Sequence, residues 1–210
     1  MILERAALVI HWVGGILAYS ILAVLFYGIW KGTRRKVGRI SGWMGTLLRS
    51  AWFYALGSIV FLGLCIIGWI PLPITPGVQW QAWLLGIGSV LLFPGMALVL
   101  WGRLALGREY FVSTSQGAQI FADQHLVKTG IYAVLRHPMY VGLILAAWGS
   151  LLVYATWTTL FFAICAPFIV LRAKQEDAVL AAEFGEQWQE YSRSVPGFFP
   201  KLRKEDREDE

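Results

Sequence analysis

Residues 139–171 read MYVGLILAAWGSLLVYATWTTLFFAICAPFIVL, a run of 33 residues without a charged side chain. About 20 helical residues cross the ~30 Å apolar core of a bilayer, so this run is too long for one ordinary span and short for two. Gly149-Ser150 and three threonines between 156 and 159 offer places for the chain to turn. We therefore predict a tight hairpin of two short helices, which returns the chain to the membrane face it left. A single tilted helix is the alternative.

Three more apolar runs precede this one. Residues 6–30, 50–70 and 80–101 each have the length of a membrane span, and tryptophans near their ends are typical of the membrane interface. The first run is too long for a cleavable signal peptide. With the hairpin, these runs predict an all-α integral membrane protein of five transmembrane helices, the last two a short helical hairpin, followed by a cytosolic C-terminal helical segment.

The composition agrees with residence in a membrane. Of the 210 residues, 57% are hydrophobic and 15% are charged, whereas about a quarter are charged in a typical soluble domain. The net charge of +5 does not indicate nucleic-acid binding, because the basic residues lie between apolar runs and not on a polar face. Cys65 and Cys165 stand inside apolar runs without a neighbouring Cys or His, so we expect neither a metal site nor a disulfide there.

The distribution of basic residues predicts the orientation. Residues 31–49 contain six Lys and Arg, residues 102–138 contain four and the chain from Arg172 onward contains seven, whereas residues 71–79 and the hairpin turn contain none. By the positive-inside rule, these three basic segments are cytoplasmic and the N-terminus is outside. The three segments agree with one another on a five-span topology.

Two polar segments fall on the same expected side of the membrane. The first, residues 124–142, contains the sequence RHPMYVG at its end, and the second, residues 172–200, contains Glu176-Asp177. Because the hairpin returns the chain to its starting face, residues around positions 137 and 176 can converge in space. We therefore place the candidate site at this cytosolic face.

Each of these residues also has an ordinary structural interpretation. Arg136 and His137 could anchor a span at the lipid headgroups. Arg172 and Glu176, four residues apart on an expected helix, could form a surface ion pair of a few tenths of a kcal/mol. His11, near the outer end of the first span, is expected to hydrogen-bond between helices or at the interface and not to bind a ligand.

The combination of motifs is more specific than any single residue. Its elements are Leu126-Val127 with Gly130-x-Tyr132, Arg136-His137-Pro138-x-Tyr140-x-Gly142, Glu176-Asp177-x-x-Leu180, and Phe184-Gly185-x-x-Trp188-x-x-Tyr191-x-x-x-Val195-Pro196. Over roughly residues 100–200, this pattern resembles the isoprenylcysteine carboxyl methyltransferase family and the wider group that includes phospholipid methyltransferases. Ile131, Trp188 and Asp177 depart from the family's usual Pro, Tyr and Glu, which bears on the methyl acceptor more than on the donor.

The resemblance implies S-adenosylmethionine as the methyl donor, bound on the cytosolic side. By position, its pocket would be lined by Gln124, His125, Leu126, Val127, Tyr132, His137, Pro138, Met139, Tyr140 and Glu176. Arg136 and Arg172 would contact the acceptor, Arg172 and Glu176 would be catalytic, and no metal is expected. Residues 1–101 would then form three membrane helices with a basic cytosolic loop, residues 102–200 the methyltransferase-like region, and residues 201–210 a disordered charged tail.

The activity implied is O-methylation of the carboxylate of an isoprenylcysteine or a similar lipid-like acceptor, which enters from the surrounding membrane lipids. A carboxylate is already ionised at neutral pH and needs no base, and Arg172 could orient it. A phospholipid amine would have to lose a proton, which gives Glu176 a possible role as a base. The same residues are also compatible with a small thiol acceptor, with an NADPH-dependent membrane reductase of the sterol type, and with a structural membrane protein without enzymatic activity.

Overall fold

The structure is a computed structural model that describes residues 2–34, 37–40, 50–110, 119–121 and 125–199. Its elements are α1 (Ile2–Thr33), β1 (Val37–Ile40), α3 (Ala51–Ile67), α4 (Val78–Leu106), η1 (Gly107–Glu109), β2 (Gln119–Phe121), η3 (Gly130–Ala133), α5 (Pro138–Tyr154), α6 (Trp157–Cys165), η4 (Ala166–Phe168), α7 (Ile169–Phe184) and α8 (Glu186–Ser194). The chain is helical as predicted, apart from one antiparallel pair, β1 with β2, which the all-α prediction did not include. The proposed tail, residues 201–210, lies outside the described residues.

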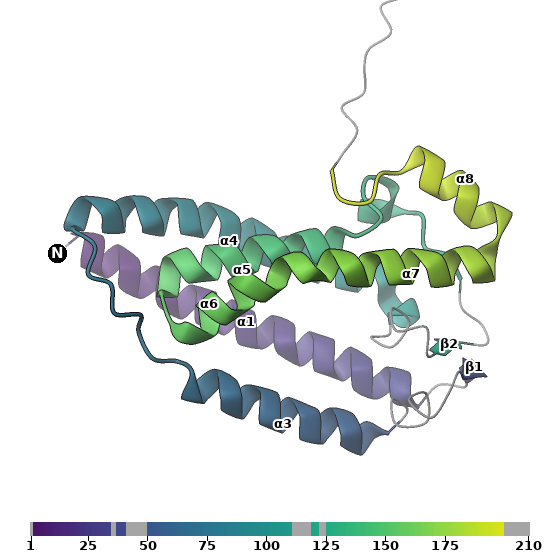
Figure 1. Ribbon diagram of the computed structural model, residues 1–210, viewed down its shortest axis with the longest axis horizontal. Coiled ribbons are helices and arrows are strands. Elements are labelled where there is room, and N and C mark those ends of the chain that lie inside the picture. Colours follow the sequence, from purple (N-terminus) through teal and green to yellow (C-terminus); the bar gives the residue numbers. More distant parts are fainter. Residues whose placement is uncertain (1, 35–36, 41–49, 111–118, 122–124, 200–210) are drawn as a thin grey trace, which may run out of the picture.

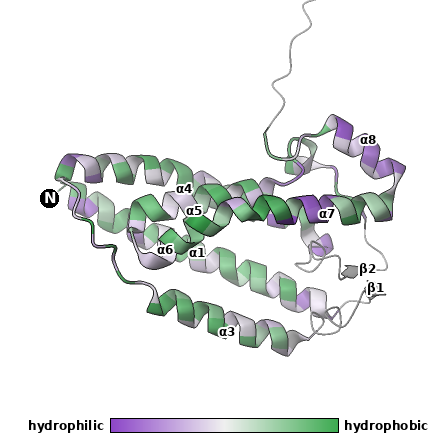
Figure 2. Cartoon of the chain, in the orientation of Figure 1, coloured by the Kyte–Doolittle hydropathy of each residue, from purple (hydrophilic) through white to green (hydrophobic). Residues whose placement is uncertain are grey.

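Five apolar helices match the five predicted apolar segments. Within the described residues, Ile2–Thr33, Val78–Glu109 and Trp157–Phe184 are long and apolar enough to cross a membrane, and Trp52–Ile67 and Pro138–Tyr154 are shorter apolar helices. Figure 2 shows hydrophobic residues along α1, α3, α4 and α5, whereas the hydrophilic residues concentrate on α8 and part of α7. These features are those of an integral membrane protein.

Helices α4 and α5 pack closely because glycines line their contact. These glycines follow one another at seven-residue intervals, as Gly88, Gly95 and Gly102 on α4 and as Gly142 and Gly149 on α5. A Cβ atom on Gly95 would lie 2.6 Å from the backbone nitrogen of Ala146 and 2.8 Å from the carbonyl oxygen of Gly142. Residues seven apart lie on the same face of a helix, so the glycines of each helix face the other helix. Small residues in such a contact let the two backbones approach closely.

The predicted hairpin is present, and the single tilted helix is wrong. Helix α5 ends at Tyr154, Ala155 adopts a left-handed conformation with φ of 46°, and Thr156 begins the return as the N-cap of α6. The Thr156 hydroxyl accepts a hydrogen bond from the backbone N–H of Thr159 at 3.3 Å, and the Thr159 hydroxyl accepts one from the N–H of Thr156 at 3.0 Å. This reciprocal cap fixes the turn at the threonines, while Gly149-Ser150 lies inside α5.

The returning arm of the hairpin continues without a break into the C-terminal helical segment that we predicted after it. Helices α6, η4 and α7 follow one another directly, and the apolar run that ends at residue 171 continues as helix to Phe184. Residues 172–183 are mostly Ala, Lys, Gln, Glu and Leu, which favour helix even where they are polar. The helix ends where Gly185 takes a φ of 50°. Arg172 and Glu176 therefore lie on the polar part of this helix, after the apolar run has ended at residue 171.

His11 connects α1 to the far end of the hairpin, as an interhelical hydrogen-bonding residue. Its Nε2 lies 3.0 Å from the carbonyl oxygen of Val153, and the Tyr154 hydroxyl donates to the carbonyl oxygen of His11 at 3.0 Å. The two rings stack with centroids 5.0 Å apart. This contact belongs to the end of the molecule that holds the N-terminus, opposite α8 and the β1–β2 pair (Figure 1).

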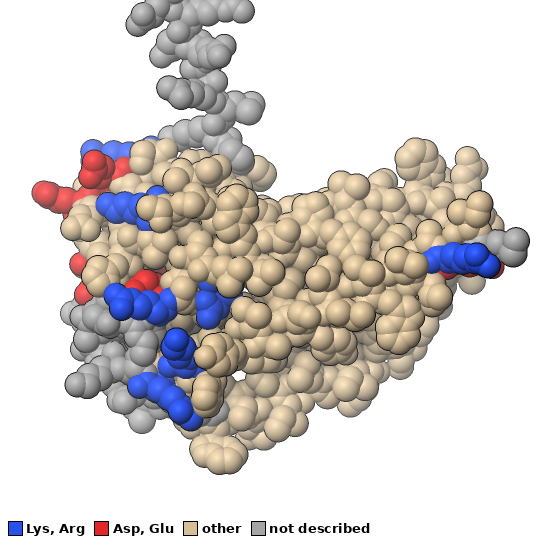
Figure 3. All heavy atoms as spheres, turned by 180° about the vertical axis from the view of Figure 1, so that it is seen from behind, with Lys and Arg blue, Asp and Glu red and all other residues tan. Residues whose placement is uncertain are grey.

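Charged side chains gather at the end that holds α8. On the face drawn in Figure 3, most of the Lys, Arg, Asp and Glu residues described lie at that end, and a smaller charged group lies at the opposite end. The surface between them is formed by other residue types. An uncharged band between two charged ends suits a chain that spans a bilayer.

Candidate active site

The start of α5 and the middle of α7 meet at the charged end of the molecule. His137 Nε2 lies 2.8 Å from Asp177 Oδ1, and Arg136 Nη1 lies 3.2 Å from Asp177 Oδ2. The His137 side chain is 5% exposed and immediately precedes α5. One carboxylate on α7 therefore holds both basic residues of the RHPMYVG motif.

A second hydrogen bond, between Tyr140 and Glu176, connects α5 to α7 one turn further along α5. The Tyr140 hydroxyl donates a hydrogen bond of 2.8 Å to Glu176 Oε2. The rings of His137 and Tyr140 stack, with centroids 5.5 Å apart and planes 14° apart. These bonds confirm the predicted convergence of residues around positions 137 and 176.

Helix α8 covers this junction with aromatic side chains. Trp188, Tyr191 and Val195 form a buried cluster against Leu126 and Leu180. The Tyr191 hydroxyl donates to the carbonyl oxygen of Tyr132 at 2.7 Å. Burial raises the pKa of Tyr191 to about 12, with a smaller opposing effect from Arg136. Tyr191 is therefore a neutral hydrogen-bond donor at physiological pH.

The chain after α8 closes over the start of α5. The backbone N–H of Arg136 donates to the carbonyl oxygen of Pro196 at 2.9 Å, and that of His137 donates to the carbonyl oxygen of Gly197 at 3.1 Å. The ring of Phe198 lies 5.5 Å from that of His137, between centroids. The Val195-Pro196 end of the motif thus fixes the backbone that presents His137.

These elements surround a cavity of about 200 Å³. Its polar and aromatic lining consists of Glu109, Tyr110, His125, Tyr132, Arg136, His137, Tyr140, Arg172, Glu176, Trp188 and Tyr191. Its apolar lining consists of Leu25, Val99, Leu106, Leu126, Val127, Met139, Leu143, Ile169 and Leu180. The cavity therefore joins a charged region to side chains from the membrane helices α1, α4 and α5.

Most of the predicted site residues meet at this cavity. Ten of them line it, namely His125, Leu126, Val127, Tyr132, Arg136, His137, Met139, Tyr140, Arg172 and Glu176. Pro138 does not line it, because it begins α5 and is buried near Gly102 of α4. Gln124 lies outside the described residues.

From the sequence we assigned no role in the site to two acidic residues of this region. Asp177 pairs with Arg136 and His137, although we had assigned a role only to its neighbour Glu176. Glu109 is buried and lines the cavity. It is one of only three acidic residues before Glu176, and its place at the end of an apolar run could have drawn attention to it. No group of three His, Cys, Asp or Glu side chains that could hold a metal ion occurs among the residues described.

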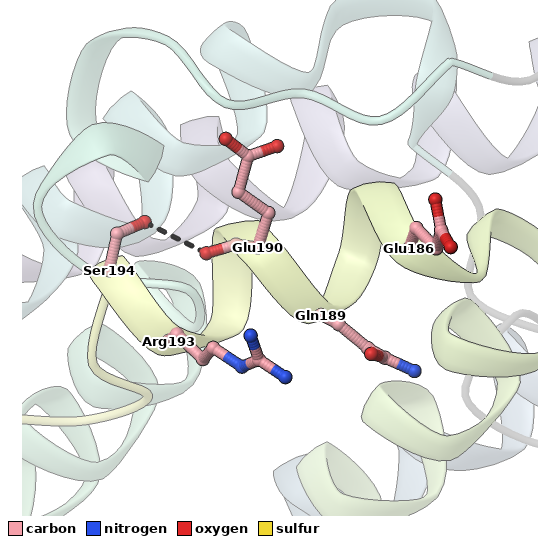
Figure 4. A pocket seen from close by; sticks show the side chains of 5 residues that line it. All are labelled: Glu186, Gln189, Glu190, Arg193 and Ser194. Carbon is pink, nitrogen blue, oxygen red and sulfur yellow. Dashed lines mark hydrogen bonds between the residues drawn. The ribbon is translucent and has the colours of Figure 1, made fainter.

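A second depression, of about 510 Å³, lies on the outside of α8. It is lined by Glu186, Gln189, Glu190, Arg193 and Ser194, and the Ser194 hydroxyl donates to the carbonyl oxygen of Glu190 (Figure 4). These five residues come from a single helix, and none belongs to the predicted site. The candidate site is therefore the cavity between α5 and α7.

Comparison with known sequences gives matches over much of the chain. A sequence model of the phospholipid methyltransferase family matches residues 83–187, half of the chain. The chain is 32% identical over 163 residues to methanethiol S-methyltransferase 2 of Bradyrhizobium diazoefficiens, covering 71% of this chain and 59% of that protein. It is 33% identical over 114 residues to the protein-S-isoprenylcysteine O-methyltransferase of Schizosaccharomyces pombe, covering 48% of each chain. The chain thus spans about half to three fifths of these two relatives.

Proposed function

Since the chain belongs to the phospholipid methyltransferase family, we propose that it transfers a methyl group from S-adenosylmethionine to an acceptor that reaches the cavity from the membrane. The observation that carries the proposal is the pairing of α5 with α7 through His137–Asp177 and Tyr140–Glu176 around one cavity. Membership of this family favours methyl transfer over the reductase and over a purely structural role.

The side chains around the cavity fit this donor. S-adenosylmethionine carries a sulfonium, an ammonium and a carboxylate together with a flat adenine. Glu176 offers a carboxylate to a cationic group, while Arg136 and His137 offer hydrogen-bond donors to an anionic one. Leu126 and Val127 supply apolar surface for an aromatic ring. When bound, the donor supplies a methyl group that is already activated, so the chain mainly has to align it with the acceptor.

Arg172 supports an anionic acceptor with an apolar body. It lies one helical turn before Glu176 on α7 and lines the same cavity, close in sequence to the apolar Ile169. Its guanidinium can orient a negatively charged oxygen or sulfur, and such a nucleophile needs no general base. Leu25 and Leu143 can surround the acceptor's apolar part. The carboxylate of an isoprenylcysteine or a similar lipid-like molecule meets both requirements.

A small thiol is the second candidate acceptor. The Bradyrhizobium relative, named for methanethiol S-methylation, aligns with a larger share of this chain than the isoprenylcysteine relative does. A thiolate is also anionic, so Arg172 can orient it in the same way. A phospholipid amine is the third candidate. It would have to lose a proton, and the Glu176 carboxylate that could accept it already accepts a hydrogen bond from the Tyr140 hydroxyl.

We also propose that the cavity faces the cytosol. The described parts of the basic segments predicted to be cytoplasmic lie toward the charged end of the molecule, where the cavity is, and the start of α1 lies at the other end (Figures 1 and 3). On this topology the N-terminus is outside and the water-soluble donor has direct access. Residues 102–200 then form the methyltransferase-like region, completed by Leu25 and Val99 from the preceding helices.

The test is methyl transfer by the purified full chain in detergent micelles. The chain is supplied with S-adenosylmethionine labelled in its methyl group and, separately, with a prenylcysteine, an alkyl thiol or phosphatidylethanolamine. We expect a base-labile methyl ester on the prenylcysteine, with loss of activity in Arg172→Ala and not in Arg193→Ala, which changes an exposed arginine of α8. A base-stable thioether as the main product would assign the thiol instead. A folded chain that methylates none of the three and binds no donor would contradict the proposal.

A further inference from the structure

We propose that Glu109 is a second carboxylate of the donor site, and that its charge makes the site prefer the cationic donor over the neutral product left after methyl transfer. This inference rests on the proposed function. Glu109 is the last residue of η1, which directly follows α4, so it reaches the cavity from a different part of the chain than Glu176 does.

Glu109 is fixed in place beside the segment predicted to hold the donor. Its side chain is 7% exposed and lines the same cavity as Glu176. Its Oε2 accepts a hydrogen bond from the backbone N–H of His125 at 3.3 Å, and its Oε1 accepts one from Arg108 Nε at 3.1 Å. The exposed His125 ring also lies near, with its Nδ1 3.9 Å from Oε1. A carboxylate has about four acceptor positions, so the two hydrogen bonds leave capacity for a ligand.

The negative charge of Glu109 acts on the cavity more strongly than the positive charge of Arg108 does. The Arg108 side chain is 65% exposed, so water and salt screen its positive charge. The buried carboxylate is screened much less, and charges interact more strongly across a low-dielectric region than through water. Glu109 therefore contributes a negative electrostatic potential to its side of the cavity.

Methyl transfer changes the charge of the group that this side of the cavity faces. The acceptor's anionic oxygen or sulfur forms a bond to the methyl carbon, and the bond from that carbon to the donor's sulfur breaks with its electron pair remaining on sulfur. The sulfonium becomes a neutral thioether, so S-adenosylmethionine loses one positive charge as it becomes S-adenosylhomocysteine. A fixed carboxylate stabilises the sulfonium and not the thioether, which favours exchange of product for fresh donor.

The experiment compares the dissociation constants of the two compounds. The purified full chain and its Glu109→Gln variant are titrated calorimetrically with S-adenosylmethionine and with S-adenosylhomocysteine. Glutamine keeps the size and one acceptor oxygen and removes the charge. We expect the Kd for S-adenosylmethionine to rise about tenfold, which corresponds to ~1.4 kcal/mol, and the Kd for S-adenosylhomocysteine to change by less than about twofold. Glu190→Gln, on the outer face of α8 (Figure 4), is the matched control and should change neither.

The outcomes separate a charge effect from a purely structural one. If Glu109→Gln raises both dissociation constants by the same factor, Glu109 only holds the His125 segment and the inference is wrong; it is also wrong if neither changes. Should that variant not fold, Arg108→Gln alters an exposed side chain and removes the positive charge that pairs with Glu109. It should increase the preference for S-adenosylmethionine, and an unchanged or reduced preference contradicts the inference. A folded wild-type chain that binds neither compound instead contradicts the proposed function.

Discussion

The hydroxyl of Tyr140 donates a 2.8 Å hydrogen bond to the carboxylate of Glu176, 36 residues later in the chain. This bond joins the first turn of α5 to the polar half of α7, and it exists because the hairpin at Thr156 returns the chain to its starting face. Both residues line the same cavity. The hydrogen bond therefore orients one wall of the proposed donor site.

Removal of this hydroxyl tests its contribution to donor binding. In Tyr140→Phe, Glu176 loses a charge-assisted hydrogen bond worth about 1–2 kcal/mol, so we expect the Kd for S-adenosylmethionine to rise roughly fivefold to thirtyfold in calorimetric titration. The control is Tyr154→Phe, which removes a hydroxyl bonded to His11 at the other end of the molecule. It should lower the melting temperature without changing the Kd. Equal effects of the two variants on the Kd would contradict a specific role for Tyr140.

Asp177 is expected to matter for stability, because it is the carboxylate shared by Arg136 and His137. Asp177→Asn leaves the partly buried guanidinium without its charge partner. Since the Asp177 side chain is 26% exposed, we expect a loss of about 1–2 kcal/mol, less than for a fully buried pair. Thermal unfolding in detergent measures it, with the exposed Glu183→Gln on the same helix as the control. Similar melting temperatures for the two variants would show that the pair adds nothing.

The glycine contact between α4 and α5 offers a matched pair of substitutions. A methyl group at Gly95 would collide with the backbone of α5, whereas a Cβ on Gly86 meets no atom within 4 Å. We expect Gly95→Ala to destabilise the protein by about 1–3 kcal/mol through overpacking. Gly86→Ala should leave stability unchanged or raise it, because alanine favours helix more than glycine. A melting temperature lowered equally by both would refute this packing.

The buried phenol of Tyr191 predicts a loss of stability in alkaline solution. Its pKa is raised to about 12 in the folded chain, against about 10 when unfolded. Between these values the unfolded chain releases the proton first, so stability falls as the pH rises. Wild type should exceed Tyr191→Phe by about 1 kcal/mol up to pH ~10, and this advantage should shrink toward pH ~12. Melting temperatures measured across this range would contradict the prediction if the advantage stayed constant.

The length of the apolar runs was sufficient to predict the membrane helices and the hairpin, because a bilayer fixes how many residues cross it. The convergence of positions 137 and 176 followed from that turn alone. The continuity of the return arm with the C-terminal helical segment was not predicted. The polar residues after position 171 indicated the end of a membrane span, whereas their helix propensity lets the same helix continue to Phe184.

Other parts of the site depend on contacts that no local pattern encodes. β1 and β2 are strands of four and three residues about 80 positions apart, too short to show an alternating pattern. The carbonyl oxygens of Pro196 and Gly197 accept hydrogen bonds from the backbone N–H groups of Arg136 and His137. Every residue type has a backbone carbonyl, so these bonds cannot be predicted from the sequence. The position of Glu109 depends on a hydrogen bond from the backbone N–H of His125, 16 residues later in the chain.

Calorimetric titration of the folded chain with S-adenosylmethionine tests most directly whether the cavity between α5 and α7 is the donor site. We predict saturable binding at one site per chain, weakened at least about tenfold in Glu176→Gln, which replaces a carboxylate lining the cavity. Glu183→Gln, on the exposed side of the same helix, should bind as wild type does. Absence of binding by folded wild type, or an unchanged Kd in Glu176→Gln, would contradict the account.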